Sequence, residues 1–491
     1  MRQATFVSYT RAALCALLGL WAVAAPAQNG RNVTQLLFEP VPLVEGRPTL
    51  DFPLATFVSA AAAVPVAAAG GLAPDGDTRN ALRDRISDSL IAIGDLESLQ
   101  GPFADPLREN LFATGQLYQT LGEHERALAL FERTLQVSRI NHGLDQPEQV
   151  AVLEAIARSY LALEKPAEAD AMMDSAFRIE ALHHGENSAG LVAAQQRLGD
   201  WNTRAFLERS SILVNIPRMN VQNFVRDPRN YMGNNYDVRS TPLFKLYQAR
   251  GNYLEAIKIL VDAGDYGNPA LMELERKLLT TLFLTTHRED ILYEPDFYLS
   301  RKKSKTASRL NQNSIELLNA EEYALGLESH RRRMGYLVAD TARTPAQLVT
   351  AMLEEADWQL MFGRKTLALD SYRAAYRFFA ENPQIVVAAR ELLYPALPQV
   401  LPTYLPPPNS REKLGIGPDS AVQYFGFIDV SFALNEFGKA RRIRQLGTGG
   451  EVTRDMEIRL GEYLRRVQFR PRFAGTEVAT GALTLRYYLG L

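Results

Sequence analysis

Apolar and polar residues alternate most regularly in the last seventy residues of the chain. Between Ile428 and Leu434 every second residue is apolar, which is the period of a half-buried strand. A turn at 435–438 leads into a predicted second strand at 439–446, and the glycines of 447–450 are expected to end that strand. The final strand is predicted from the alternating residues Leu483, Leu485, Tyr487 and Leu489.

A helix is predicted between the second and the last strand. Thr453 is a residue type that caps helix N-termini, and Asp455 adds an acidic group to the first turn. After Phe469-Arg470-Pro471-Arg472-Phe473, a turn is expected at Gly475. These elements make a strand–strand–helix–strand (ββαβ) domain over residues 420–491, whose helix has an apolar stripe of Met456, Leu460, Leu464 and Val467.

This order of elements resembles the C-terminal domain of the TonB family. The matching features are the turn that ends in Gly438, the helix end from Arg465 to Phe469, and the Phe-x-Pro of Phe469 and Pro471. The resemblance implies that the domain takes up an extended segment of a partner along a sheet edge, and that it couples inner-membrane machinery to an outer-membrane receptor.

The last strand is the expected edge, because no later strand follows to cover it. Three arginines of the second strand would give this domain a positive flank. The residues expected to contact a partner are therefore Arg441, Arg442, Arg444, Leu483, Leu485, Tyr487 and Leu489.

The first 27 residues have the pattern of a secretory signal peptide. Arg2 and Arg11 flank a polar start, residues 12–24 are nearly all apolar, and Ala25-Pro26-Ala27 has the small-x-small pattern of a cleavage site. Cleavage would remove Cys15, the only cysteine, so the mature chain would fold without disulfides. We expect a periplasmic protein of a Gram-negative bacterium, not associated with the membrane once cleaved. The alternative is a retained membrane anchor.

A second periodicity, of 42 residues, lies in the middle of the chain. The series Gly115, Tyr118, Gly122, Ala127, Phe131 and Thr134 recurs as Ala157, Tyr160, Glu164, Ala169, Met173 and Ala176. This spacing resembles the tetratricopeptide repeat, in the longer form found in kinesin-light-chain-like proteins. The resemblance implies an array of paired helices whose groove binds extended peptides. The sequence shows no clear basic carboxylate clamp, and Asn110 and Arg158 are only examples of residues that could line the groove.

The predicted fold class is therefore α+β and multidomain, with a helical tetratricopeptide-like solenoid followed by the small ββαβ domain. Weaker copies of the repeat are expected at 198–201, 247–260 and 356–375. The predicted segments are a signal peptide (1–27), an Ala/Pro-rich linker (28–78), repeats (79–210), a loop region (211–241), degenerate repeats (242–397), a Pro-rich connector (398–419) and the C-terminal domain (420–491).

Charge is distributed unevenly although the whole chain is nearly neutral, with 54 Lys and Arg against 56 Asp and Glu. From Arg411 onward there are 13 basic and 9 acidic residues, a net charge of +4, which leaves about −8 for residues 28–410. Such an asymmetry suggests an acidic partner or contact between the two parts, and the alternative is ordinary variation of charge over the surface. The basic runs lack interleaved aromatics, so no nucleic-acid partner is expected.

No motif of catalysis is present in a suitable setting, so we expect neither an enzyme nor a cofactor. His183-His184-Gly185-Glu186 lacks the His-x-x-x-His spacing of helical metal sites. The leading hypothesis is an exported adaptor that binds protein or peptide partners in the cell envelope. The alternatives are a TonB-class energy transducer, which needs an N-terminal anchor, and a structural envelope scaffold without a receptor.

Overall fold

The computed structural model describes residues 36–44, 47–48, 76–185, 187–208, 242–291, 308–340, 342–414, 417 and 422–490. The predicted signal peptide (1–27) and the predicted loop region (211–241) lie outside these ranges. The described residues belong to two compact units. The first contains the helices between Gly76 and Asp262, and the second contains two N-terminal strands together with all elements from Pro269 onward.

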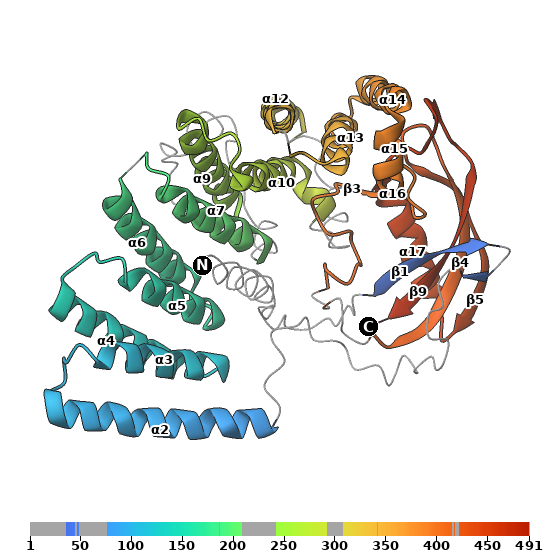
Figure 1. The fold of residues 1–491 in the computed structure, drawn as a ribbon. Helices are drawn as coiled ribbons and strands as arrows, with labels where there is room; N and C mark the ends of the chain where they lie inside the picture. Colours follow the sequence, from blue (N-terminus) through green and yellow to red (C-terminus); the bar gives the residue numbers. More distant parts are fainter. Residues whose placement is uncertain are drawn as a thin grey trace, which may run out of the picture. The chain divides into compact units, whose positions relative to one another are not determined.

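The first unit consists of helices stacked in chain order (Figure 1). Each of the helix pairs α3–α4 and α5–α6 forms one repeat, and α7 packs on α9. The helices are α2 (Gly76–Gln100), α3 (Leu107–Thr120), α4 (His124–His142), α5 (Gln149–Ala162), α6 (Pro166–His184), α7 (Leu191–Glu208) and α9 (Pro242–Asp262).

Helix boundaries in this unit repeat with the period read from the sequence. Helices α3, α5 and α7 begin at residues 107, 149 and 191, and α2, α4 and α6 end at 100, 142 and 184. Each of these ends is followed by a glycine with positive φ, which a side chain would disfavour: Gly101 at +91°, Gly143 at +93° and Gly185 at +81°. The predicted pair of 42-residue repeats is confirmed, with a helix before it and a helix after it in the same register.

Close packing between paired helices depends on glycine facing an aromatic ring. A Cβ on Gly115 would lie 2.5 Å from the Phe131 ring, and a Cβ on Gly199 would lie 2.5 Å from the Tyr253 ring. Tyr253 thus packs against the glycine of α7 in the same way as Phe131 packs against the glycine of α3. The prediction that 247–260 is a separate copy of the repeat was wrong, because α9 is helical through Gly251 and supplies only the second helix of the repeat that α7 begins.

The second unit begins with further helices. The predicted late repeat is the pair α13–α14, in which Ala356, Ala368, Tyr372 and Ala375 are buried in one apolar cluster. Thr344 and Gln347 cap α13 with a reciprocal pair of hydrogen bonds. The helices are α10 (Pro269–Ile291), α12 (Ser308–Ala339), α13 (Pro345–Met361), α14 (Lys365–Glu381), α15 (Pro383–Ala388) and α16 (Arg390–Leu393).

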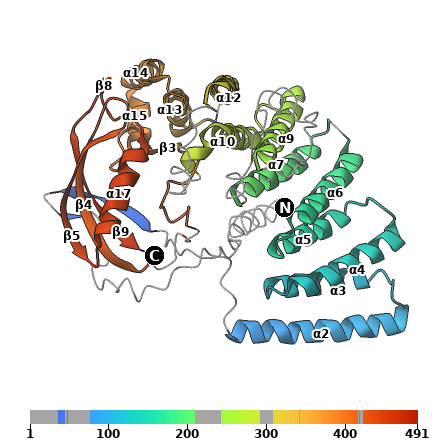
Figure 2. The same cartoon turned by 180° about the vertical axis from the view of Figure 1, so that it is seen from behind.

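An antiparallel sheet of order β2-β1-β9-β4-β5 completes this unit. Helix α17 (Arg454–Arg466) lies along one face of the sheet, as Figure 2 shows, and buries Leu460 and Leu464 against it. The strands are β1 (Leu37–Val44), β2 (Arg47–Pro48), β4 (Tyr424–Leu434), β5 (Ala440–Gly450) and β9 (Ala482–Gly490), with the short β3 (Val400–Leu401), β6 (Gln468–Phe469), β7 (Phe473–Ala474) and β8 (Glu477–Val478) outside this sheet.

Strand β9 is central in the sheet, so the prediction that Leu483–Leu489 forms an open edge was wrong. It pairs with β4 on one side and with β1 on the other. Leu483, Leu485, Tyr487 and Leu489 are buried in the core beneath α17. The covering strand comes from the segment predicted as a linker, which therefore contains structure at Leu37–Val44 and gives way to α2 at Gly76.

The predicted end of the second strand was also wrong, because β5 continues to Gly450. Its glycines fit the neighbouring strand where larger residues would not. A Cβ on Gly449 would lie 2.4 Å from the Phe427 ring, and Gly450 has φ of +79°. Residues 447–450, which were predicted to end the strand, therefore belong to it. Glycine at 449 leaves room for the Phe427 ring, and glycine at 450 permits the positive φ.

In the predicted connector (398–419), the described residues 398–414 are not a free linker, because they pack within the second unit. Strand β3 pairs with β6, and Leu401 and Phe473 lie in the same apolar cluster as α13 and α14. The ring of Phe473 stacks on Tyr376 with centroids 4.6 Å apart. The helices from α10 onward and the sheet thus belong to one compact unit, whereas the sequence predicted a boundary at residue 397.

A buried ion pair joins the loop after β6 to α13. Arg470 Nε donates to Asp357 Oδ1 at 2.9 Å, and the guanidinium makes a second contact with Oδ2. The side chains are only 12% and 3% exposed. Tyr372 Oη also donates to Asp357.

Removal of one member of this pair should destabilise the second unit strongly. Asp357→Ala leaves the Arg470 guanidinium buried without a counter-charge, and we expect the free energy of unfolding to fall by about 3–5 kcal/mol. Denaturant unfolding of the full chain measures it. Asp370→Ala, which breaks the exposed Arg373–Asp370 pair on α14, should change it by about 0–1 kcal/mol. Equal effects of the two substitutions would contradict a stabilising role for the buried contact.

His330 on α12 should make the second unit sensitive to acid. Burial and the neighbouring Arg333 lower the pKa of His330 well below its ordinary value of 6.5. Arg333 in turn pairs with Glu354 of α13 at 2.6 Å. Below pH 6.5 the unfolded state gains a proton that the folded state does not, so stability should fall with pH by up to about 1.4 kcal/mol per unit. Comparing unfolding at pH 5 to 7 for the native chain and His330→Gln tests this expectation: the variant should have the smaller slope. An equal slope in the two proteins would mean that His330 is protonated in the fold.

Candidate protein-binding surfaces

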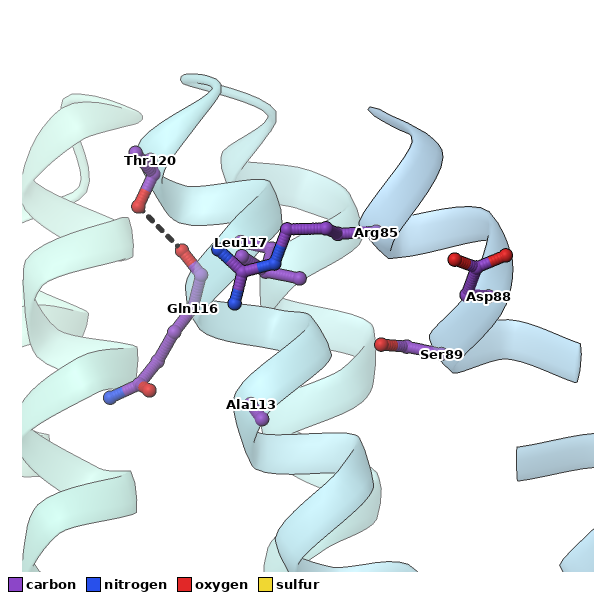
Figure 3. Close-up of a pocket in the computed structure, with 7 residues that line it drawn as sticks. All are labelled: Arg85, Asp88, Ser89, Ala113, Gln116, Leu117 and Thr120. Carbon is purple, nitrogen blue, oxygen red and sulfur yellow. Dashed lines mark hydrogen bonds between the residues drawn. The ribbon is translucent and has the colours of Figure 1, made fainter. Parts of the chain in front are cut away.

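A pocket of about 530 Å³ lies between α2 and α3 at the beginning of the helical array (Figure 3). It is lined by both polar and apolar side chains. The residues are Arg85, Asp88 and Ser89 from α2 and Ala113, Gln116, Leu117 and Thr120 from α3.

This pocket lies where one more helix of the repeat would pack. One period further on, Ala155 and Ser159 of α5 correspond to Ala113 and Leu117, and there they meet α3. Gln119 Nε2 of α3 donates to the Ala155 carbonyl at 2.9 Å and to Ser159 Oγ at 2.8 Å. The surface beside α2 is therefore the equivalent of a helix–helix contact.

The same position carries polar residues on α2. Ser89 stands one period before the buried Phe131, and Arg85 stands one period before the buried Ala127. Helix α2 also runs without a break through 79–81, the equivalents of the turn at 121–123. Among the described residues no helix covers this surface, and its polarity is that of a terminal capping repeat. Within the part of the chain that the structure describes, the pocket marks the N-terminal end of the array.

Arg158 on α5 is the strongest candidate for binding a charged group on the array. It corresponds by one period to Gln116, and both side chains are exposed. It makes no hydrogen bond or ion pair with any described residue. Surrounding protein atoms lower the pKa of Arg158, Glu154 opposes this effect, and the like charge of Arg204 on α7 lowers the pKa further. A partner carboxylate would relieve this crowding of positive charge. Asn110 instead donates to the Pro106 carbonyl of its own helix.

Strand β1 closes the edge at which partner binding was predicted. The carboxylate of Glu39 accepts a hydrogen bond from Arg411 Nε at 2.8 Å and another from Tyr424 Oη. Burial and the Glu39 carboxylate raise the pKa of Tyr424. Asn409 holds the start of the strand, because its carbonyl accepts from the Phe38 N–H at 2.9 Å and its Nδ2 donates to the Leu36 carbonyl at 2.7 Å.

The outer side of β1 is also unsuited to pairing with another strand. Phe38 donates away from β9, so the main-chain nitrogens of Pro40 and Pro42, two and four residues later, face the same way. Proline has no N–H to donate. Beyond them, β2 pairs with Leu43 and Val44. Within the described residues, the two outermost strands of this sheet are the two-residue β2 and the eleven-residue β5, so β5 is the long edge strand that none of these devices covers.

The predicted arginines lie on that remaining edge strand. Arg441, Arg442 and Arg444 are all exposed on β5, and none makes a hydrogen bond or ion pair with a described residue. Register shifts interrupt the pairing of β5 with β4 at two places, and Arg442 has φ of +54°. The structure thus separates the predicted site, since the arginines are accessible whereas Leu483, Leu485, Tyr487 and Leu489 are in the core.

Sequence reasoning missed the residues that hold β1 in place. Glu39 lies some 370 residues before Asn409 and Arg411 in the chain, and no local pattern links the two segments. The available signal was the short, mostly apolar stretch from Leu36 to Val41. The prolines at 40 and 42 favoured the prediction of a linker over that of a strand.

Neither a metal site nor a membrane-spanning helix is found in the ranges that the structure covers. No three His, Cys, Asp or Glu side chains there are placed to share a metal ion. The rings of His183 and His184 meet edge to face at the end of α6, with centroids 5.0 Å apart. None of the described helices combines the length and the hydropathy needed to cross a bilayer.

Comparisons with known proteins identify the helical repeat. Residues 110–181 match the family model of the tetratricopeptide repeat. A comparison with curated proteins gives no significant match. Among solved structures, BtubC (BKLC) from P. vanneervenii is 14% identical with a TM-score of 0.28, over 61% of this chain and 92% of that chain. A putative kinesin light chain from Podosopora anserina, with nearly identical TPR-like repeats, is 13% identical with a TM-score of 0.28, over 60% and 99%.

The first unit therefore contains tetratricopeptide repeats, and such repeats generally bind protein partners. They are typically parts of non-enzymatic scaffolds. The role that these repeats indicate for the chain is that of a protein–protein interaction adaptor.

Proposed function

We propose that this protein is an exported adaptor of the bacterial cell envelope, and that its helical array binds an acidic segment of a partner protein. The observation that carries the proposal is the position of Arg158. It is exposed on α5 and makes no hydrogen bond or ion pair with a described residue, because the nearby Glu154 carboxylate pairs with Arg197 instead, and Arg204 of α7 adds positive charge beside it. A carboxylate is the group that two neighbouring guanidinium groups favour most.

The compartment in this proposal rests on the N-terminal pattern. Residues 1–27 have the charge, apolar run and small-x-small site of a cleaved leader. The resemblance of residues 420–491 to the TonB family supports the same compartment. With β1 in place, the adaptor does not bind its partner by strand addition to β9.

An energy transducer of the TonB class would need an anchor in the inner membrane to receive force. N-terminal sequencing of the protein recovered from an expressing Gram-negative cell separates the two functions. The adaptor predicts a mature start near Gln28 in the periplasmic fraction. Recovery of residues 1–27 on the protein in the membrane fraction would contradict export by cleavage and favour the transducer.

Binding to the array should depend on Arg158. A peptide library with acidic and neutral members, screened against the full chain, should select acidic peptides. Arg158→Ala should weaken their binding about tenfold, as expected for the loss of one charge-assisted hydrogen bond. Fluorescence anisotropy on the selected peptides measures the effect.

The matched control is Arg178→Ala on α6. Arg178 is 58% exposed and pairs with Asp145 at 3.0 Å, so this variant also loses one surface charge from the same unit. Its affinity should remain within about twofold of the native value. Selection of neutral peptides, or an equal loss in both variants, would overturn the assignment of Arg158 as the carboxylate-binding residue.

A further inference from the structure

The face of the sheet opposite α17 carries a row of small residues beside unpaired arginines. Ile428, Val430 and Phe432 of β4 are buried on the α17 side, so the alternate residues between them point to the other face. Two cross-strand rows lie on that face. One runs from Arg441 through Ala433 to Ala482, and the other runs from Arg444 through Ser431 to Thr484.

These small residues make an accessible floor. Ser431, Ala433 and Thr484 are partly exposed and Ala482 is exposed, so no described side chain covers them completely. The next row ends the floor, because Arg486 makes two hydrogen bonds with Asp429, at 2.8 and 2.9 Å, and its guanidinium lies 3.6 Å from the centroid of the Phe427 ring. The charge of Arg486 is thereby satisfied, whereas those of Arg441 and Arg444 are not.

The spacing of the two arginines matches that of an extended chain. Arg441 pairs with Ala433 and Arg444 pairs with Ser431, so the extra residue of the irregularity between them leaves the arginines two positions apart along the sheet. Two positions span roughly 7 Å, which is also the distance between alternate residues of an extended peptide. Alternate carboxylates on such a peptide could therefore meet both guanidinium groups.

Main-chain pairing is disfavoured at this place. Two register shifts interrupt β5, and the positive φ of Arg442 turns the backbone at one of them. Interrupted and charged edges resist the addition of a regular strand. Recognition at this surface therefore relies on side chains, which suits a ligand defined by its charge.

We propose that this sheet face binds an extended acidic segment of a partner protein, with carboxylates at alternate positions paired to Arg441 and Arg444 over the floor of small residues. The net charge of +4 from Arg411 onward favours an acidic ligand on this part of the chain. The surface is distinct from Arg158 in the first unit and requires no strand exchange. It would give the adaptor a second binding site.

The probe is a fluorescent ten-residue peptide of alternating Glu and Ser, compared with one of alternating Gln and Ser. Titrations use the full chain carrying Arg158→Ala, so that the array contributes no binding through that residue. We expect binding of the Glu peptide and none of the Gln peptide. The double substitution Arg441→Gln/Arg444→Gln should weaken binding at least tenfold, because both charge-assisted contacts are lost.

The matched control removes the same charge from the opposite side of the domain. Arg454→Gln/Arg459→Gln alters two arginines of α17 that already pair with Glu457 and Asp455, and should leave the affinity within about twofold. Thr484→Trp keeps both arginines but fills the floor, and should also abolish binding. Circular dichroism and the unfolding midpoint verify that each variant is folded.

Three results would overturn the proposal. Equal losses in the two double variants would show general attraction between opposite charges, and unchanged binding in the Arg441/Arg444 variant would show that the peptide binds elsewhere. Arginine-dependent binding to phosphatidylglycerol vesicles without binding of the Glu peptide would assign the face to an anionic membrane. None of these outcomes bears on Arg158, whose own test uses a different unit of the chain.

Discussion

The main-chain pairing of β1 with β9 determines what the second unit can bind. Strand β9 would otherwise be the edge of the sheet, with unpaired N–H and C=O groups along its length. The main chain of β1 at Leu37, Glu39 and Val41 pairs in register with β9. The side chains of Leu36 and Phe38 add to the core beneath α17. On its outer side, β1 offers two prolines in place of donors. The strand therefore satisfies one edge without creating another.

One short motif contacts both the sheet and the helices beside it. In Phe469-Arg470-Pro471-Arg472-Phe473, the first phenylalanine is buried in the core of the sheet, and the last stacks on Tyr376 in the cluster of α13 and α14. Arg470 lies between them and meets Asp357. The motif that suggested a separate C-terminal domain is thus one of the contacts that join that domain to the helices of its unit.

Local patterns predicted the elements well, whereas pairing between distant segments was out of their reach. The 42-residue period appears in the sequence because each repeat has the same packing requirement, with a small residue such as Ala127 facing its partner helix. The alternation of apolar residues from Ile428 to Leu434 likewise appears in the sequence because these side chains share one buried face of the strand. The role of β1 depends on Asn409 and Arg411, and nothing near Leu37 in the sequence reveals these partners. The glycines of β5 were wrongly predicted to end the strand. The reason for glycine at 449 is the neighbouring Phe427 ring, which lies on another strand and cannot be seen in the local sequence. For the binding surfaces, exposed arginines could be named from the sequence, but which of them lack a counter-charge is a property of the fold.

The distance in sequence between β1 and β9 has a consequence for how the chain is made. Asn409 and Leu36, which hydrogen-bond to each other, are separated by 373 positions. Strand β1 is synthesised before every other described element, and β9 is synthesised after all of them. The helical array contains mainly contacts between neighbouring helices and can form as it emerges, whereas the five-stranded sheet can form only after β9 has been made. Until then β1 lacks the strand with which it pairs, so closure of this sheet is a late step in the folding of the second unit.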